Sequence, residues 1–146
     1  MKEGREEETL VYYIWLTPYS KNIRDRLFKG IPSPLKHLIF LKTQRTIRGD
    51  LHGHGIGRHT EDEIYGLAKR DFHAVSSFLG EKKFLFGDKP CLADAALFAI
   101  EAPFIWEMTE SPQSLFIHKE LRNLVDHATR IKESYFPDWD QIIADN

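Results

Sequence analysis

The sequence predicts an all-α fold. Three observations support this fold class: apolar residues recur at helical spacing, prolines and glycines separate the periodic stretches, and no stretch of useful length alternates apolar and polar residues as a strand would. Residues 91–100 carry almost no polar side chain. Because a helix that is apolar on all sides must be covered on all sides, we expect this segment to be the buried central helix of a bundle.

The first part of the chain predicts three helices followed by a loop. Residues 5–16 suit a helix that acidic side chains open and that stops before Pro18. A short helix over residues 20–28 ends at Gly30, and Pro34 suits the start of a third helix. The third helix is expected over residues 34–48, and the glycine- and histidine-rich residues 49–59 are expected to form a loop.

The second part predicts three further helices. Residues 60–79 keep one apolar face and open with Thr60 and Glu63, which have the spacing of a capping box. The central helix begins at Cys91, and Pro103 ends or kinks it before a further turn. That turn is expected at 104–108, and a loop at 111–114 follows it. A long helix is expected over 117–134, and Pro137 stops it. Trp139, Ile142 and Ile143 are expected to fold back onto the body of the domain.

One acidic residue lies in the middle of the apolar face of helix 60–79. Asp71 either reaches water past its neighbours or is buried and needs a partner, since burial of an unpaired carboxylate is costly. Arg58 is the first candidate partner, because a guanidinium can bind a carboxylate with two parallel hydrogen bonds. Both interpretations stay open at this point.

Length and charge limit the classes of function. The chain has 146 residues, which suits one domain covering residues 1–146, and a net charge of −2, which gives no electrostatic reason to expect nucleic-acid binding. A single cysteine allows no intrachain disulfide and suits a reducing compartment. The amino terminus is too acidic for a leader peptide, and no apolar run is long enough to span a membrane. We therefore expect a cytoplasmic protein.

The segment from Phe86 to Asp94 reads Phe-Gly-Asp-Lys-Pro-Cys-Leu-Ala-Asp. It resembles the turn and the helix start that open the buried helix of the glutathione S-transferase carboxy-terminal domain. Further stretches, Gly55–Thr60, Asp71, Ser76–Gly80 and Phe84–Asp88, resemble the failed axon connections group, which includes cadmium-responsive and metaxin-like proteins. The resemblance covers most of the chain and implies a transferase-like helical bundle.

Two departures from the family pattern stand out. Cys91 replaces the Ser or Thr that the family places at the helix N-cap, and a thiol is the weaker acceptor, although Asp94 can still reach the Cys91 amide. The family's thioredoxin-like amino-terminal domain, which binds glutathione and carries the catalytic residue, is not found in this sequence. The resemblance thus implies no cofactor in this chain, with glutathione binding only alongside such a domain.

No residue is predicted to be catalytic. A thiol at a helix N-terminus can act as a nucleophile, but Cys91 has no identifiable activating base, so a capping role is favoured. His52, His54 and His59 have spacing that zinc or copper could accept. No cysteine or fixed carboxylate completes that set, so a flexible surface loop without a metal is favoured.

An aromatic stripe lies on the first helix. The resemblance places Tyr12, Tyr13 and Trp15 where the superfamily builds the wall of its hydrophobic substrate pocket. Aromatic residues at helical spacing are more often packed in a core or at an interface, and we favour that interpretation. If a preceding domain is missing, the same region should expose apolar surface for a partner.

Two functional hypotheses follow. The first is a non-catalytic interaction module of a failed axon connections-type protein, with a role in axon development, which binds a thioredoxin-like domain, another protein or a second copy of itself. The second is the substrate-side half of a glutathione S-transferase-like enzyme, in which this chain alone has no activity. The missing chemistry favours the first, although a fold alone does not fix function.

Overall fold

The computed structural model describes the backbone of residues 5–141 and, within that range, every side chain except those of residues 5–7, 20 and 22. Nearly all regular structure in this range is helical, and its only β-type pairing is an isolated bridge between Phe84 and Gly87. The all-α prediction is confirmed. The chain divides into two compact units, Met1–Gly66 and Leu67–Asn146, which are described separately below.

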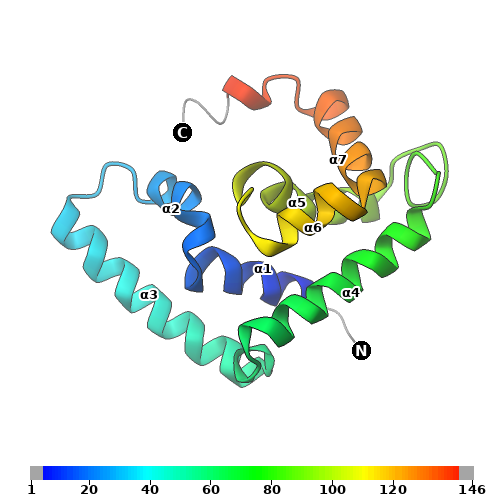
Figure 1. Cartoon of the computed structure of the whole chain (residues 1–146). Helices are drawn as coiled ribbons and strands as arrows, with labels where there is room; N and C mark the ends of the chain where they lie inside the picture. The colour runs from blue at the N-terminus through cyan, green and yellow to red at the C-terminus, as the bar shows by residue number, and fades with distance from the viewer. Residues whose placement is uncertain (1–4, 142–146) are drawn as a thin grey trace. The chain divides into compact units, whose positions relative to one another are not determined.

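The described residues of the first unit form three α-helices and two short 3₁₀ turns (Figure 1), and aromatic side chains pack between the helices. Its elements are α1 (Arg5–Leu16), the 3₁₀ turn η1 (Pro18–Ser20), α2 (Lys21–Leu27), α3 (Ser33–His54) and the 3₁₀ turn η2 (Ile56–Arg58). Trp15 of α1 lies edge-on to Phe28 and stacks on Phe40 of α3, with ring centroids 6.2 and 6.3 Å apart. The Gln44 side-chain amide donates to the Trp15 carbonyl at 2.7 Å, which fixes the inner face of α3 against α1.

Helix α3 is longer than predicted. The expected loop at residues 49–59 is wrong for its first half, because α3 continues through Gly49 and Gly53 to His54. Leu51 is buried on the inner face, so packing outweighs the cost of about 1 kcal/mol that each glycine adds to a helix. The helix ends at Gly55, whose φ of 109° suits a residue without a Cβ.

Helix α4 (Glu61–Leu79) begins in the first unit, and most of it belongs to the second. The second unit continues with α5 (Leu92–Ala102), the π-helical turn η3 (Pro103–Glu107), α6 (Pro112–Glu120) and α7 (Arg122–Tyr135). Its fully buried side chains include Leu79, Phe104, Met108, Ile117 and Leu124. Pro103 ends the regular helix as predicted, and the chain continues in a wide turn closed by the Met108 amide on the Pro103 carbonyl at 2.8 Å.

The predicted helix over 117–134 is two helices. Ser111 accepts a hydrogen bond from the Ser114 amide and caps α6, so the expected loop at 111–114 is wrong. Pro112 occupies the first turn, where its missing N–H costs nothing. The break falls at Leu121, whose φ of −122° and ψ of 53° leave the helical region although neither proline nor glycine is present.

The composition of α5 predicted a helix covered on all sides, and this prediction is wrong. Asp94, Leu97, Phe98 and Glu101 are buried on one side, whereas Leu92 is 86% exposed. Ala95, Ala96 and Ala99 continue the exposed stripe along the helix. Alanine side chains are small, so their exposure to water costs little. The composition of the helix did not reveal that one side of it is exposed.

The chain after α7 folds back onto the second unit. Trp139 lies edge-on to Phe98 at 5.8 Å and packs against Trp106 at 5.5 Å, while Phe136 stacks on Phe98. The other two residues predicted to fold back, Ile142 and Ile143, lie outside the described residues. Among those described, no helix is both long enough and apolar enough to cross a membrane.

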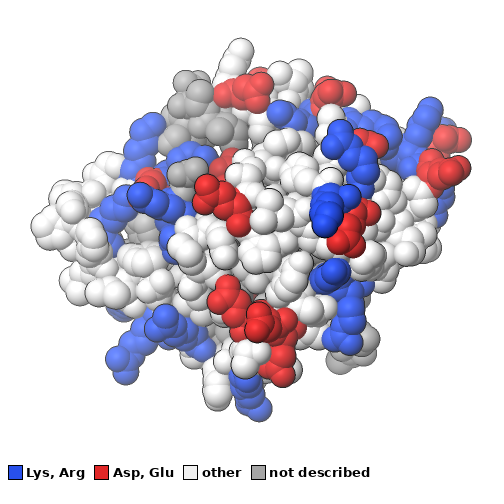
Figure 2. Space-filling model, viewed as in Figure 1, with Lys and Arg blue, Asp and Glu red and all other residues white. Residues whose placement is uncertain are grey.

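Charged side chains alternate in sign over most of the visible face in Figure 2. A surface without charged side chains, drawn white, extends at the left, where Figure 1 places the start of α3. Lys and Arg side chains border this surface.

Candidate functional site

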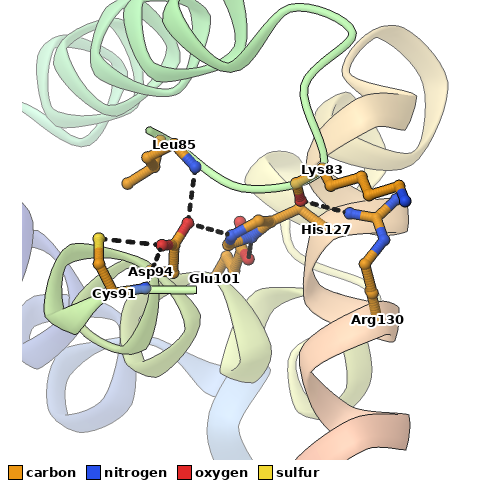
Figure 3. Close-up of polar contacts among 7 residues, drawn as sticks. All are labelled: Lys83, Leu85, Cys91, Asp94, Glu101, His127 and Arg130. Carbon is orange, nitrogen blue, oxygen red and sulfur yellow. Dashed lines mark hydrogen bonds and ion pairs between the residues drawn. The ribbon is translucent and has the colours of Figure 1, made fainter. Parts of the chain in front are cut away.

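A tight turn leads the chain into α5. The Phe84 amide donates to the Gly87 carbonyl at 2.9 Å, and the Gly87 amide donates back to Phe84 at 3.1 Å. Gly87 has a φ of 124°, a backbone angle that a residue with a Cβ rarely adopts. The turn places Leu85 and Cys91 on either side of the first turn of α5, with their amides directed at the same carboxylate (Figure 3).

Asp94 is that carboxylate, and its side chain is 1% exposed. Its Oδ1 accepts the Leu85 amide at 2.7 Å, and its Oδ2 accepts the Cys91 amide at 2.8 Å and the Cys91 thiol at 3.1 Å. His127 of α7 approaches Oδ1 with Nε2 at 3.0 Å. Asp94 therefore joins the turn, the start of α5 and α7 at one buried point.

His127 continues the network to a second carboxylate. Its Nδ1 lies 2.8 Å from Oε1 of Glu101, and neither side chain is exposed. An imidazolium ring donates from both nitrogens, so one charged histidine satisfies Asp94 and Glu101 together. Between two carboxylates, His127 reduces the net negative charge that α5 places in the interior.

Burial and charge act on these three groups in opposite directions. Burial alone would raise the pKa of Asp94, but the hydrogen bonds from Leu85, Cys91 and His127 lower it to about 2. Burial raises the pKa of Glu101 to about 7, against the smaller opposing effects of the hydrogen bond and charge of His127. Burial lowers the pKa of His127, yet the hydrogen bonds and charges of Glu101 and Asp94 raise it above 6.5 overall.

Helix α7 also holds the segment that precedes the turn. Arg130 donates to the Lys83 carbonyl (Figure 3). Asn123 donates to the carbonyls of Ser76 at 2.9 Å and Gly80 at 3.2 Å, and accepts the Ser76 hydroxyl at 2.7 Å. Asn123 thus binds two carbonyls at the end of α4, and the Ser76 carbonyl also accepts the Gly80 amide at 2.9 Å.

The chemistry open to this network is limited. Both nitrogens of His127 are occupied, and all three side chains are shielded from solvent, so no substrate reaches an acid or base here. Glu101 Oε2 is buried without a hydrogen-bond partner among the described residues. Among the side chains that the structure describes, no group of three or more His, Cys, Asp or Glu is arranged to hold a metal ion.

Comparison with known proteins identifies this part of the chain. The family model of the glutathione S-transferase C-terminal domain matches residues 68–131, which lie inside the second unit and contain the whole network. Residues 68–131 match the glutathione S-transferase C-terminal domain. The resemblance that the sequence indicated is therefore confirmed for this part.

The curated relatives include members of the expected failed axon connections and metaxin group. The chain is 31% identical over 133 residues to "Failed axon connections" of Drosophila melanogaster, covering 87% of this chain and 32% of that protein. It is 29% identical over 138 residues to "Mitochondrial outer membrane import complex protein METAXIN" of Arabidopsis thaliana, covering 88% and 41%. An enzyme, "Isoprene-epoxide--glutathione S-transferase" of Rhodococcus sp. (strain AD45), is 31% identical over 87 residues, covering 58% and 35%.

The chain thus spans less than half the length of each of these relatives. No solved structure matches it significantly.

Both predicted capping sites have hydrogen bonds in the structure. At α4, the Thr60 amide donates to Glu63 Oε2 at 2.8 Å, and the Glu63 amide approaches the Thr60 hydroxyl at 3.3 Å. At α5 of the transferase domain, Asp94 accepts the Cys91 amide as expected, but the thiol acts as a donor to Asp94. The Cys91 side chain is exposed, and a thiolate there would lie beside the Asp94 carboxylate.

The other predicted residues lie apart from the network. Arg58 donates from Nε to the His52 carbonyl at 3.0 Å, and Asp71 is half-buried in α4, so their pairing stays a prediction. His54 contacts Glu8 at 3.1 Å, and His59 lies 3.5 Å from Glu63. His52 and His54 are on α3, while His59 follows η2, so they do not share the flexible loop that the sequence predicted.

The aromatic stripe of α1 packs within the first unit. Tyr13 is fully buried and lies against Tyr12 and Tyr19, with ring centroids 5.4 and 6.4 Å apart. Trp15 belongs to the aromatic core with Phe28 and Phe40. These contacts match packing, the interpretation that the sequence favoured, and they do not test a substrate pocket.

Sequence reasoning missed Glu101 and His127. Glu101 follows Asp94 by seven residues, which is two helical turns, so two acids on one face of an otherwise apolar helix were a visible signal. His127 lies between the buried residues Leu124, Val125, Ala128 and Ile131 of α7. Its partner on a different helix could be found only from the structure.

Proposed function

We propose that this chain is a non-catalytic helical interaction module of a failed axon connections-type protein. The observation that carries the proposal is the sealed network of Asp94, His127 and Glu101. These are the acids and the base that the transferase domain brings together, and their side chains are at most 1% exposed. Groups held this way support the fold, so function is expected on the surface.

The exposed stripe of α5 supports a protein partner. Leu92 is 86% exposed and lies on the same side of the helix as Ala95, Ala96 and Ala99. Phe86, just before the helix, is 71% exposed, and its ring lies 5.7 Å from that of Phe78. Exposed apolar residues gathered at one helix are typical of an interaction site.

The partner in this proposal is a thioredoxin-like domain, another protein or a second copy of the chain. The similarity to the Drosophila protein suggests a role in axon development, which is part of the proposal. We also propose a cytoplasmic location. The printed name of the Arabidopsis relative assigns that protein to an outer-membrane import complex, so cell fractionation should include a mitochondrial fraction.

Light scattering after size-exclusion chromatography tests the interaction. The chain is run alone over a range of concentrations and with a thioredoxin-like domain of a glutathione S-transferase added in trans. Self-association or a complex is expected, and Leu92→Glu should abolish it, with the exposed Leu115→Glu of α6 as the matched control. The proposal would be contradicted if the chain stays monomeric and does not bind the thioredoxin-like domain. Equal binding by the Leu92→Glu and Leu115→Glu variants would also contradict it.

The second candidate is the substrate-side half of a glutathione S-transferase-like enzyme. The similarity to the Rhodococcus transferase favours it over other enzyme classes. In that case glutathione binds only when a thioredoxin-like domain is joined to this chain. Conjugation of chlorodinitrobenzene by the longer protein, and none by this chain, is the expected result; no glutathione binding by the longer protein removes the candidate.

A further inference from the structure

The outer face of α3 exposes a row of leucines. Leu35, Leu38 and Leu41 are 50, 66 and 62% exposed, and their spacing of three places them on one side of the helix. Leu27, at the end of the preceding helix, is 59% exposed. Single exposed leucines are ordinary, but three in succession on one helix face are not.

Lysine and arginine side chains lie on the same face of α3, closer to the end of the helix. Lys42, Arg45 and Arg48 are exposed and follow the leucines on the same side. Lys42 and Arg45 have no ion pair among the described residues, whereas Lys36 is paired with Asp25 at 2.8 Å. Residues 18–54 contain eight lysines and arginines and only two acidic residues, although the whole chain has a net charge of −2.

The leucines cannot turn inward, because the opposite face of α3 is already fixed. Phe40 packs on Trp15 and Phe28, Gln44 donates to the Trp15 carbonyl, and Leu51 is buried. The uncoloured surface at the left of Figure 2, bordered by blue side chains, lies where Figure 1 places the start of this helix. The outer face is therefore a stable feature of the first unit.

The composition of this face distinguishes between two kinds of partner. Protein interfaces are enriched in aromatic anchors and depleted in lysine. The exposed positions of α3 include three leucines, one lysine, two arginines, three histidines and a single acid, Asp50, and no Phe, Tyr or Trp. Leucines that enter the acyl boundary beside cations that meet lipid phosphates are the pattern of helices that lie in the plane of an anionic bilayer.

We propose that the outer face of α3, defined by Leu35, Leu38, Leu41, Lys42, Arg45 and Arg48, binds the surface of a membrane that contains anionic lipids. The helix lies on the bilayer and does not cross it. This inference is separate from the protein-partner function proposed above, which uses the stripe on α5. The two can fail independently.

Vesicle co-sedimentation of the full chain tests the proposal. The probes are vesicles of phosphatidylcholine alone and vesicles with about 30 mol % phosphatidylserine, a content that gives a negative surface potential. Binding is expected only to the anionic vesicles and should weaken strongly at about 0.5 M salt, where the Debye length falls to a few Å. Absence of binding to anionic vesicles at low salt would overturn the proposal.

Two variants separate the contributions of the leucines and of the cations to vesicle binding. Lys42→Gln with Arg45→Gln should lower the partition coefficient roughly 25-fold, since each cation contributes about fivefold near an anionic surface. The triple change of Leu35, Leu38 and Leu41 to Gln should lower it by roughly tenfold. Gln is nearly as good a helix former as Leu, and all five positions are exposed, so the fold should persist.

Matched controls on α6 are Leu115→Gln and Lys119→Gln, both at exposed positions. They should bind anionic vesicles as the unchanged chain does. Equal losses in the α3 and α6 variants would overturn the proposal, because binding would then depend on charge or apolar content anywhere on the surface. A triple leucine variant that loses self-association without losing vesicle binding would assign this face to a second copy instead.

Discussion

The Nδ1 atom of His127 lies 2.8 Å from the Oε1 atom of Glu101, with both side chains fully buried. Through Nε2 the same ring reaches Asp94, so one histidine of α7 links the first and last turns of α5. The network therefore holds together the turn at residues 84–91, α5 and α7, and its titration should be visible in the stability of the protein.

Glu101→Gln should flatten the pH dependence of stability. Burial raises the pKa of Glu101 to about 7 in the folded chain, while the unfolded value is 4.5. A raised folded pKa gives stability that is present below pH 4.5 and is lost as the pH rises through 7. His127, whose folded pKa is also raised, loses stability in the same direction above pH 6.5.

The free energy of unfolding of the unchanged chain should thus fall between about pH 5 and 8, by an amount on the order of 3 kcal/mol from Glu101. Urea denaturation at several pH values measures it. Parallel pH profiles for the chain and the Glu101→Gln variant would show that Glu101 does not titrate as described.

Asp94→Asn should remove stability at neutral pH and weaken the response to acid. The hydrogen bonds to Asp94 outweigh its burial and lower its pKa to about 2, from 3.8 in the unfolded chain. A lowered folded pKa gives stability that is present above pH 4 and is lost as the pH falls through 2, worth on the order of 2 kcal/mol. Acid titration followed by circular dichroism measures this, and an unchanged acid transition in the variant would contradict it.

His127→Ala should be severely destabilising, because it leaves two buried acids without their shared cation. Breaking a buried ion pair by removal of one partner costs about 3–5 kcal/mol. The adjacent Asp126→Ala is the control, since Asp126 is exposed and surface changes stay within about 0.5 kcal/mol. Urea denaturation should separate the two variants clearly; similar midpoints would argue against the network.

Part of the fold and of the buried network could be predicted from the sequence, and part could not. The starts of α4 and α5 follow from Thr60–Glu63 and Cys91–Asp94, because a capping box is local chemistry. The length of α3 could not be predicted, since its second half depends on the tertiary burial of Leu51. The Asp94–His127–Glu101 network depends on two helices meeting, so only the spacing of its two acids was visible beforehand.

Two glycines test the corrected end of α3. Gly53 lies in the helix with nothing within 4 Å of an added Cβ, so Gly53→Ala should stabilise the chain by about 0.5–1 kcal/mol. At Gly57 an added Cβ would meet the His52 amide nitrogen at 2.7 Å and the Leu51 carbonyl carbon at 2.9 Å, so Gly57→Ala should destabilise it. Thermal melts of both variants check this; a loss of stability in Gly53→Ala would favour the loop that the sequence predicted.

Cys91→Ser should leave the fold intact and strengthen the cap of α5. A hydroxyl can replace the thiol as donor to Asp94 and is a better acceptor for the amides of the first turn, so a gain of a fraction of about 1 kcal/mol is expected. Cys91→Ala removes the thiol donor and should be the less stable of the two. The reverse order in thermal melts would show that Cys91 does not act as a cap.

The central claim is that His127 is a sealed, charged link between two acids and not a base that meets substrate. Nitrogen NMR of the labelled chain tests it directly, through the two ring nitrogens of His127. We predict that both carry a proton at pH 6, that these protons exchange slowly with water, and that the ring titrates above its ordinary pKa of 6.5. A ring that is neutral at pH 6, or whose protons exchange as fast as those of an exposed histidine, would contradict the account.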